Sequence, residues 1–587
     1  MNKIQWKEWN EDTFRKAKEA DKPILLGISA VWCHWCHVMD QTSYSDQENI
    51  KIINTDFIPI RVDTDKRPDI NRRYNMGGWP TTVFLTPQGD IIGGGTYIPP
   101  EQLRSLLLKV REYYKKNKED LYAEISKLET KIKAYKKPSE GELSKSIISD
   151  TIGIISDHFD PVYGGFGTEP KFPFPEALEL VLSGALATMN IEYFRKKDEY
   201  LFCILRITMD TMADSGTFDQ EIGGFFRYST NRDWSIPHFE KMCEDNAKLL
   251  SIYLKAYQLT QRSKYKETAE KIIKYVDTTL KDKEFGVFFG SQDADEEYYK
   301  LNKKEREKRK APYVDKTIYT DWNARMASSY LLASYVLEEP KYHKFALKAI
   351  EFLLLNSYSK ENGMYHYFID GKPRVLGLLT DQINMVQCLI DAYSATGEPK
   401  YLNFAVNLAD FMILLLWNAE VGALSDKIED PKAIGALRYP DISIAENSIA
   451  ADLLIRLHYL TNKKDYKEMA YAILSRFSKD YQGYNLQACG YALAVDRYLN
   501  PPVKMNIVGS IEDLKTLELL AECNRVYEPR KIIHVLDPIH DKEKLSQHGY
   551  APSEIPVVYI CIDNICLAPI SKAEDIKVEI YKNITYK

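Results

Sequence analysis

Two kinds of connection alternate along a long series of predicted helices, and this alternation constrains the fold of the chain more than any other feature. Apolar residues at helical spacing predict twelve helices between Ile147 and Leu499. Their predicted starts lie near residues 143, 174, 197, 243, 264, 320, 341, 379, 399, 444, 464 and 486. Short polar turns join one set of helix pairs, and four of these turns lead into a tyrosine, at Tyr265, Tyr342, Tyr401 and Tyr466. This recurrence indicates internal repeats.

Segments that combine glycine with aromatic or apolar residues make the other connections. They are Gly164–Phe166, Gly223–Phe226, Gly286–Phe289, Gly363–Tyr365, Gly422–Leu424 and Gly483–Tyr484. In an up-and-down series of helices every second connection lies at the same end, so these six segments are expected to share one face. The pattern predicts an (α/α)6 toroid over residues 140–500, in which an inner ring of helices surrounds a central cavity. A polar, breaker-rich stretch at 134–141 marks the expected start of this domain.

The residues before the toroid alternate between strand and helix patterns around a C-x-x-C pair. The predicted elements are strands at 23–30, 57–63, 82–86 and 91–94, a helix directly after the cysteines and another at 101–118. We therefore expect an α/β domain over residues 1–135. Cys33 would lie at a helix N-terminus, where unpaired backbone N–H groups and the helix dipole stabilise a thiolate. Cys36 would lie one turn further on, close enough to resolve a mixed disulfide.

Three other interpretations use the same two cysteines. Cys33–His37 also matches C-x-x-C-H, the attachment pattern of a c-type haem, but Met1–Glu8 has no apolar core of the kind an export signal needs. A zinc site could combine the pair with a neighbouring histidine, and the distant Cys561 and Cys566 are the only candidates for its remaining ligands. The cysteines could also simply pack in a core. We favour redox-active thiols, with no metal and no cofactor.

The N-terminal motifs resemble the thioredoxin fold and, more closely, the thioredoxin-domain proteins related to spermatogenesis-associated protein 20. The matching strings are Trp35–Met39, Arg67–Asp69, Gly77–Pro80 and Gly94–Tyr97. The resemblance implies that Cys33 is the nucleophile, Cys36 the resolving cysteine and Pro80 the cis-proline that faces them. Gly27 stands where thioredoxin has the buried acid that takes a proton from its resolving cysteine, and His34 or His37 could serve instead.

The helical region resembles the six-hairpin glycosidase and N-acylglucosamine 2-epimerase architectures, and the family named above carries such a domain. The matching strings are Gly164–Gly167, Pro170–Pro173, Gly223–Phe225, Arg227-Tyr228, Pro237–Met242, Asp245-Asn246, Gln292–Asp295 and Trp322-Asn323. The resemblance specifies a family rather than a reaction, because one fold can serve many chemistries.

Polar residues gather on the face that carries the glycine–aromatic segments, and they are the candidates for a toroid site. They are His238, Glu240, Asp245, Asp293, Asp295, Trp322 and Asn323. The histidine and the carboxylates could act as general acids or bases, and the tryptophan could stack on a sugar ring. A glycosidase needs two carboxyl groups about 5–9.5 Å apart. Each residue also has a structural interpretation, as a hydrogen-bonded loop histidine, a helix cap or a core aromatic side chain.

The last part of the chain predicts a small α/β lobe over residues 501–587. Its pattern is a helix over 511–522 flanked by strands at 503–508, 531–536 and 557–561. Cys561 and Cys566 could form a second redox pair, pair with Cys33 or pack in the core. The charged run Lys303–Lys310 is expected to be a solvated helical face.

Bulk properties exclude several classes of partner. The chain has 78 basic and 84 acidic residues and a net charge of −6, which argues against nucleic-acid binding. Its longest apolar run, Phe411–Trp417, is far shorter than the roughly 20 residues that cross a bilayer. Nine cysteines scattered along the chain do not resemble a secreted disulfide framework. We expect a cytoplasmic protein with no membrane partner.

These features lead to a ranked set of hypotheses about function. The first is a thiol–disulfide oxidoreductase or redox-regulated protein that uses Cys33 and Cys36 on a thiol or disulfide partner, with a carbohydrate-type cavity in the toroid. The second is a glycoside hydrolase or sugar epimerase that acts on a small carbohydrate-like ligand, with a structural thioredoxin-like domain. The third is a non-catalytic binding or adaptor protein.

Overall fold

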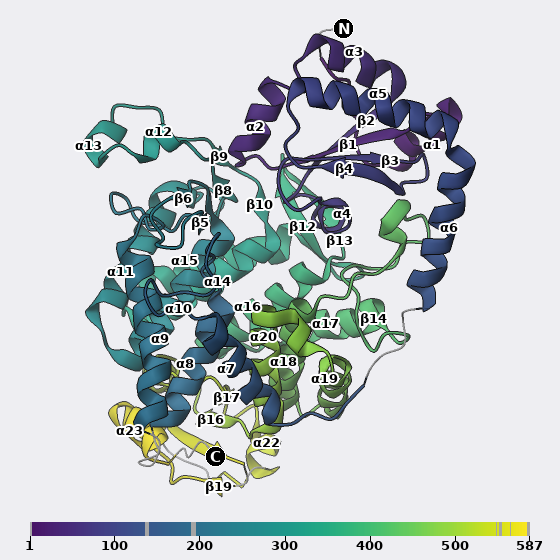
Figure 1. Ribbon diagram of the computed structural model, residues 1–587. Coiled ribbons are helices and arrows are strands. Elements are labelled where there is room, and N and C mark those ends of the chain that lie inside the picture. The colour runs from purple at the N-terminus through teal and green to yellow at the C-terminus, as the bar shows by residue number, and fades with distance from the viewer. Residues whose placement is uncertain are drawn as a thin grey trace.

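The computed structural model describes residues 3–134, 140–189, 195–547, 549–550, 555–563 and 565–583. Three parts follow one another along the chain and are stacked in space, with the N-terminal domain and the C-terminal lobe at opposite ends of a helical body (Figure 1). Most of the stretch expected to link the first two parts, residues 135–139, lies outside the described residues.

The N-terminal domain is a four-stranded sheet with helices on both faces. Its strands are β1 Ile24–Ser29, β2 Ile58–Asp63, β3 Thr81–Leu85 and β4 Ile91–Gly95, in the order β2-β1-β3-β4. Its helices are α1 Glu11–Ala20, α2 His34–Gln41, α3 Gln47–Asp56, α4 Pro68–Tyr74, α5 Pro100–Lys116 and α6 Lys118–Ala134. β1 pairs in parallel with β2 and antiparallel with β3, and β3 pairs antiparallel with β4. This is the predicted thioredoxin-like fold.

Glycine at the end of β4 lets that edge strand lie close to β3. Gly93–Gly95 pair with Thr82–Phe84 and continue the strand. A Cβ atom on Gly94 would lie 2.5 Å from the carbonyl oxygen of Thr82, which is closer than real side chains approach. Gly94 is therefore a position in this sheet edge that only glycine fits.

The predicted toroid of twelve helices is confirmed within the described residues. The inner ring consists of α8 Pro175–Met189, α10 Cys243–Thr260, α14 Thr320–Val336, α16 Leu379–Thr396, α18 Ile444–Thr461 and α20 Cys489–Leu499, and α20 contacts α8 to close it. The outer helices are α7 Ser146–His158, α9 Arg195–Asp214, α11 Ser263–Tyr275, α15 Pro340–Asn356, α17 Pro399–Leu416 and α19 Lys464–Phe477. The largest errors in the predicted starts are 143 against 146 and 486 against 489. Helical periodicity is clearest in outer helices such as α11 and α19, which are apolar on one side, and weaker in inner helices such as α14 and α18, which are apolar on several sides.

An amide side chain near the start of four inner helices holds the preceding glycine–aromatic segment. Asn323 shows the pattern: its Oδ1 accepts from the Phe288 N–H at 2.7 Å, and its Nδ2 donates to the carbonyls of Phe288 and Tyr319 at 2.9 Å each. The equivalent pairs are Asn246 with Phe225, Gln382 with Met364 and Asn447 with Leu424. These amides satisfy backbone groups that no regular element pairs, so we call them the amide clamps.

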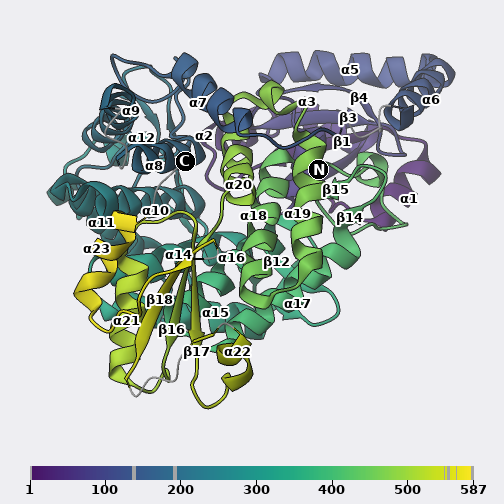
Figure 2. The ribbon, with the colours of Figure 1, turned by 90° about the horizontal axis from the view of Figure 1, so that it is seen from below.

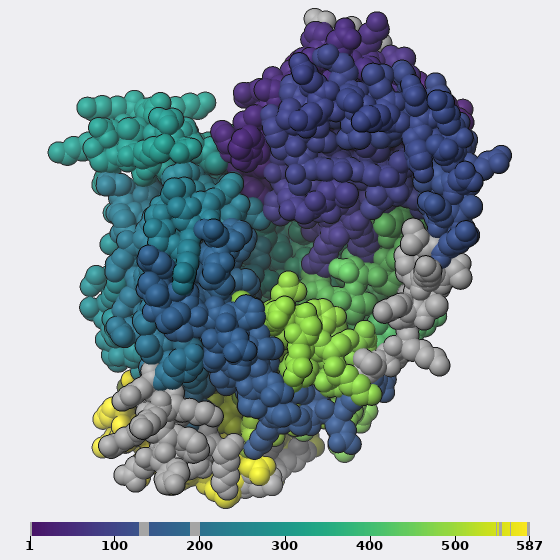
Figure 3. Space-filling model, viewed as in Figure 1, coloured from purple at the N-terminus to yellow at the C-terminus, as the bar shows by residue number. Residues whose placement is uncertain are grey.

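The six glycine–aromatic segments share one face, as predicted, and short strands form in the connections that contain four of them. These are β5 Tyr228–Ser229, β6 Pro237–His238, β7 Lys241–Met242, β8 Ser291–Gln292, β9 Val314–Asp315, β10 Ile318–Tyr319, β11 Tyr358–Ser359, β12 Gly363–Ile369, β13 Lys372–Leu376, β14 Trp417–Asn418 and β15 Ala423–Leu424. The N-terminal domain sits on this face (Figures 1 and 3). Arg73 and Asp426 form a buried ion pair across the contact at 2.7 Å, with side chains 7% and 3% exposed.

The segment between α11 and α14 corrects one expectation. It carries the short helices α12 Glu296–Tyr299 and α13 Lys303–Arg306 and extends beside the N-terminal domain (Figure 3). The charged run here was expected to be solvated throughout, but Arg306 is only 5% exposed. Its guanidinium pairs with Asp219 at 2.7 Å, and Asp219 also binds the buried Lys241. Arg306 is therefore buried because it forms an ion pair with Asp219, a buried carboxylate that also binds Lys241.

The C-terminal lobe repeats the strand arrangement of the N-terminal domain. It consists of β16 Val503–Val508, α21 Leu514–Arg525, β17 Lys531–Leu536, α22 Lys542–Gln547, β18 Val557–Ile562, β19 Ile565–Cys566 and α23 Ala573–Asn583. The sheet order is β17-β16-β18-β19, with one parallel and two antiparallel pairings as in the first sheet. The predicted α/β lobe is thus a second domain of thioredoxin-like topology, with no cysteine between β16 and α21.

The lobe packs on the short-turn end of the toroid, opposite the N-terminal domain (Figure 2). Gln258 donates to the Arg525 carbonyl at 2.7 Å, and Asn524 donates to the Ser394 carbonyl at 2.8 Å. Cys561 and Cys566 lie opposite each other on β18 and β19 and form a disulfide. They therefore pair with each other rather than with Cys33. No helix in the described part of the chain is long and apolar enough to span a membrane.

Candidate functional site

Cys33 and Cys36 lie at the start of α2, where the N-terminal domain meets the toroid. Cys33 is the N-cap residue of α2, and its Sγ accepts from the Cys36 N–H at 3.2 Å. Both residues are free thiols and both are buried, with 5% and 1% of their surfaces exposed. The peptide bond between Trp79 and Pro80 is cis. A C-x-x-C pair on the surface of a domain would be open to solvent, whereas this pair is covered.

Arg227 of the toroid covers the cysteine end of the N-terminal domain. Its guanidinium lies over the rings of Trp32, the residue before Cys33, and Trp79, at 4.5 and 4.8 Å from the ring centres. Trp32 is held in turn, because its Nε1 donates to the Asp65 carboxylate at 2.6 Å. A cation between two indole rings is attracted to both faces. The toroid therefore contributes a positive charge to the surroundings of the cysteines.

Glu240 brings a carboxylate to the same junction. It is 2% exposed, its Oε1 contacts His238 Nδ1 at 3.3 Å, and its buried Oε2 has no hydrogen-bond partner among the described residues. The His238 ring stacks on Tyr228 with centres 4.6 Å apart. Burial raises the pKa of Tyr228, and the charges of Glu240 and Cys33 raise it further. Glu240, Tyr228 and Cys33 thus lie within electrostatic reach of one another.

The surroundings of Cys33 raise its pKa, although its position at a helix N-terminus was expected to lower it. The hydrogen bond with the Cys36 thiol is the largest cause that raises the pKa of Cys33, followed by burial and the charges of Cys36 and Glu240. The Cys36 backbone N–H lowers it, as a helix N-terminus should, but by less. In this closed arrangement Cys33 is therefore held as a thiol.

The candidate acids Asp293 and Asp295 have separate partners. Asp293 contacts Nε2 of His37 at 3.1 Å, across the junction between the two domains, and this contact is the largest cause that raises the pKa of His37. Asp295 is the N-cap of α12 and accepts from the Tyr298 N–H at 2.9 Å. His34 is exposed and its ring meets the Trp35 ring at 5.9 Å. Of the two histidines beside the motif, the structure places His37 rather than His34 against the toroid.

The remaining candidates lie at the start of two inner helices. Asp245 is partly buried, and burial followed by repulsion from Glu244 raises its pKa to about 6. Trp322 is buried in the core, with its ring 4.3 Å from that of Tyr319. Asn323 is one of the amide clamps. The structure therefore brings His238 and Glu240 together beside Cys33 and gives Asn323 a structural role.

Residues 1–133 match the family model Thioredox_DsbH, described as protein of unknown function DUF255. Human spermatogenesis-associated protein 20 is 25% identical over 97% of this chain and 89% of its own length. The chain is similar to spermatogenesis-associated protein 20 along nearly its whole length. The resemblance predicted from the motifs is confirmed, and it spans all three parts of the chain.

Two narrower likenesses were also found. A thioredoxin H-type protein from Fagopyrum esculentum is 35% identical over 78 residues, which are 13% of this chain and 63% of that protein. The solved structure of cellobiose 2-epimerase from Spirochaeta thermophila covers 60% of this chain and 98% of its own at 13% identity, with a TM-score of 0.46. The toroid assignment itself depends on the helix arrangement described above.

A second buried cluster faces the N-terminal domain from the toroid. Asp321, His366 and Asp381 bring one potential ligand atom each within 4.8 Å of one another. His366 Nε2 lies 2.6 Å from the Asp65 carbonyl oxygen, which can only accept, so this nitrogen carries a proton. Nδ1 faces the Asp381 carboxylate at 3.0 Å. The geometry therefore fits an imidazolium held between two acceptors better than a metal ligand.

Sequence reasoning missed Arg227 and Asp65 as parts of the junction. Arg227 directly follows the Gly223–Phe226 segment, and its string was recognised as a family feature without a role. Asp65 lies two residues after the end of β2. The C-terminal ends of β1 and β2 lie together in a parallel pair, so an acid after β2 could have been placed near Cys33. No signal in the sequence indicates that a toroid residue covers the motif.

Proposed function

We propose that this protein is a thiol–disulfide oxidoreductase whose Cys33–Cys36 pair works under the cover of the toroid. The observation that supports this most directly is the placement of Glu240 and Arg227 beside a reduced C-x-x-C pair at the start of α2. A carboxylate that can accept a proton and a fixed cation are the groups that thiol exchange needs. Because Cys33 is only 5% exposed, the substrate would be a small or extended disulfide rather than a folded protein surface.

The proposed reaction begins with removal of a proton from Cys33, with Glu240 as the acceptor. The Cys33 thiolate attacks one sulfur of the substrate disulfide, forms a mixed disulfide and releases the first substrate thiolate, which takes up a proton. Cys36, after losing its own proton, attacks the Cys33 sulfur. The Cys33–Cys36 bond forms and the second substrate thiolate leaves and is protonated. The cysteine pair loses two electrons and the substrate gains them, so an external thiol must restore the pair.

Glu240 would act here in place of the acid missing at Gly27. The Glu240 carboxylate comes from the toroid, lies in a buried position and retains one oxygen without a hydrogen bond among the described residues. A buried carboxylate oxygen without a hydrogen bond is costly to maintain, so Glu240 is available to a new donor such as the Cys33 thiol. Arg227 would stabilise the negative charge that develops on sulfur, since its charge lies next to the residue preceding Cys33.

A sugar-converting enzyme is the alternative from another class. It would use the carboxylates on the loop face, but Asp293 and Asp295 have the structural partners described above. None of the seven candidate residues lines the described central cavity. This arrangement favours the thiol function over a carboxylate pair.

Trapping of a mixed disulfide tests the proposal. A Cys36→Ser variant, treated with oxidised glutathione, should accumulate a glutathione adduct on Cys33, because the resolving thiol is absent. Intact-protein and peptide mass spectrometry would locate the adduct. Cys388→Ser, at a buried thiol of α16, is the matched control and should behave as wild type. If Cys33 forms no adduct with glutathione disulfide or with a smaller dialkyl disulfide, the proposed function is wrong.

A further inference from the structure

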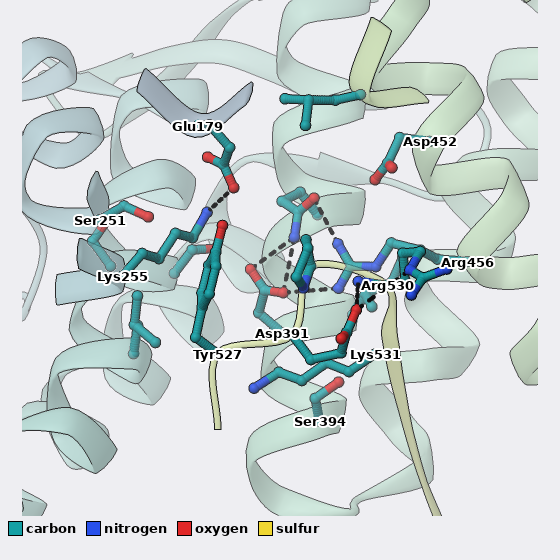
Figure 4. Close-up of a pocket in the computed structure, with 18 of the residues that line it drawn as sticks. Glu179, Ser251, Lys255, Asp391, Ser394, Asp452, Arg456, Tyr527, Arg530 and Lys531 are labelled. Carbon is teal, nitrogen blue, oxygen red and sulfur yellow. Dashed lines mark hydrogen bonds and ion pairs between the residues drawn. The ribbon is translucent and has the colours of Figure 1, made fainter. Parts of the chain in front are cut away.

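A cavity of about 410 Å³ lies in the toroid, away from the cysteines. Its walls come from the inner helices and from residues 524–533 of the C-terminal lobe, which complete it (Figure 4). Its lining does not include Cys33, Arg227 or Glu240. The volume is in the range of small-molecule sites, about 300–1,000 Å³.

The charged side chains around this cavity are largely neutralised by one another. The ion pairs are Lys255 with Glu179 at 2.5 Å, Arg456 with Asp391 at 3.1 Å, Lys248 with Glu176 at 3.3 Å, Arg530 with Glu528 at 3.5 Å, and Arg497 with Asp452. Lys531 Nζ donates to three backbone carbonyls, the nearest being that of Val526 at 2.7 Å. An ionic ligand would have to disrupt such pairs, so the cavity is better matched to an uncharged molecule.

Four polar atoms of the lining nevertheless have no hydrogen-bond partner among the described residues: Arg325 Nε, Ser328 Oγ, Arg497 Nη1 and the Tyr527 hydroxyl. The last two lie at the contact with the lobe, since Arg497 donates to the Pro529 carbonyl through its other nitrogen and Tyr527, which is 4% exposed, is a lobe residue. Tyr527 belongs to the lobe, and its side chain stands between Lys255 and Asp391 in the cavity (Figure 4). An unsatisfied buried donor costs about 1–3 kcal/mol. A ligand that offers hydroxyl oxygens could satisfy both groups at the lobe contact without bringing charge into the cavity.

The rest of the lining suits the same class of ligand. The hydroxyl side chains of Ser251 and Ser394 lie at the cavity, and the rings of Tyr527 and Tyr335 provide flat apolar surfaces. The Tyr335 hydroxyl donates to the Ala395 carbonyl at 2.6 Å, which holds that ring in place. Flat rings next to hydroxyls and paired charges favour a molecule with C–H faces and hydroxyl edges.

We propose that the cavity closed by the C-terminal lobe binds a small, uncharged, hydroxyl-rich ligand that contacts Tyr527 and Arg497. The site is separate from the Cys33–Cys36 pair and does not depend on the proposed redox function. Because Tyr527 belongs to the lobe and the cavity walls belong to the toroid, such a ligand would also stabilise the contact between these two parts.

Calorimetric titration of the full chain tests this site. The probes are D-glucose, D-mannose and myo-inositol as neutral polyols, with D-glucose 6-phosphate and D-gluconate as charged counterparts. At least one neutral probe should bind, and each charged probe should bind more weakly than its neutral parent. Tyr527→Phe, which removes only the hydroxyl, should lower the affinity for the neutral probe about tenfold.

Two control variants test whether the effect is specific to Tyr527 and whether the ligand site is independent of the redox pair. Tyr393→Phe removes another buried hydroxyl at the lobe contact, one that accepts from the Val535 N–H and does not line the cavity, and it should bind as wild type. Cys33→Ser should also bind as wild type, so failure of the redox proposal would leave this result intact. The site assignment is overturned if no neutral probe binds, if a charged probe binds best, or if Tyr527→Phe binds as tightly as Tyr393→Phe.

Discussion

At the level of single residues, Glu240 has two opposite effects on the Cys33 thiol. Its negative charge raises the pKa of the Cys33 thiol, yet the same carboxylate is the proposed acceptor of that proton. A negative charge disfavours a nearby thiolate, and this holds the site in its protonated form until a base takes the proton. The two effects can be measured separately, because one changes the pKa of the Cys33 thiol and the other changes the rate of disulfide exchange.

Glu240→Gln should therefore lower the pKa of Cys33 and still slow disulfide exchange. The neutral amide removes the repulsion, so the rise in iodoacetamide alkylation with pH should begin at lower pH than in wild type. Exchange with oxidised glutathione should slow by about tenfold or more, since the proton acceptor is lost. Glu297→Gln, at an exposed position on α12, should change neither quantity. Unchanged exchange in Glu240→Gln would remove Glu240 from the mechanism.

Residue identities near Cys33 were only partly predictable. The C-x-x-C motif, Pro80 and the pair His238 and Glu240 could be named from spacing and resemblance. Arg227 could not, because its role depends on a contact between segments almost 200 residues apart in sequence. The expected low thiol pKa followed from the helix N-terminus alone, and it failed to account for the burial that docking produces.

The toroid was predictable at the level of elements because its glycine–aromatic segments recur along the chain, and the amide clamps hold four of these segments. Each clamp lies near the start of an inner helix and recurs with the glycine–aromatic segment before it, so a local pattern repeats with the fold. The strand topology of the C-terminal lobe was not predictable, because short strands of similar composition do not reveal their pairing order. Only the register of β16 with β17 and β18 shows that this lobe repeats the first sheet.

Asn323→Ala should destabilise the toroid by about 2–4 kcal/mol. The substitution leaves the Phe288 N–H and two carbonyls without their buried partner, and each such loss costs about 1–3 kcal/mol. Urea denaturation followed by far-UV circular dichroism would measure the change. Asn362→Ala, at an exposed turn, should stay within about 0.5 kcal/mol of wild type. If the two variants were equally stable, the clamp would have no energetic role.

The contact between the N-terminal domain and the toroid sets access to the cysteines at the level of the whole molecule. Arg73→Met should leave Asp426 buried without its cation, which typically costs about 3–5 kcal/mol. We expect looser docking and faster alkylation of Cys33 at neutral pH. Arg15→Met breaks only exposed pairs with Asp12 and Glu19 and should leave alkylation unchanged. Equal rates in both variants would show that docking does not cover the thiol.

The stability of the contact between the N-terminal domain and the toroid should depend on pH through His366. Burial opposes its charge, but Asp381 outweighs this and raises the pKa of His366 from 6.5 to about 10. A raised histidine pKa gives stability that is fully present below pH 6.5 and is lost as the pH rises towards 10. The stability difference between wild type and His366→Asn, from urea denaturation, should therefore shrink across this range. A difference that stays constant with pH would contradict a charged His366.

We propose above that Cys33 and Cys36 form a working redox couple beneath the toroid. A glutathione redox titration of the wild-type chain, with alkylation and peptide mass spectrometry at each point, tests it most directly. We expect a reversible Cys33–Cys36 disulfide that forms and disappears with the ratio of oxidised to reduced glutathione. Two thiols that stay reduced at every ratio, while the protein remains folded, would contradict it.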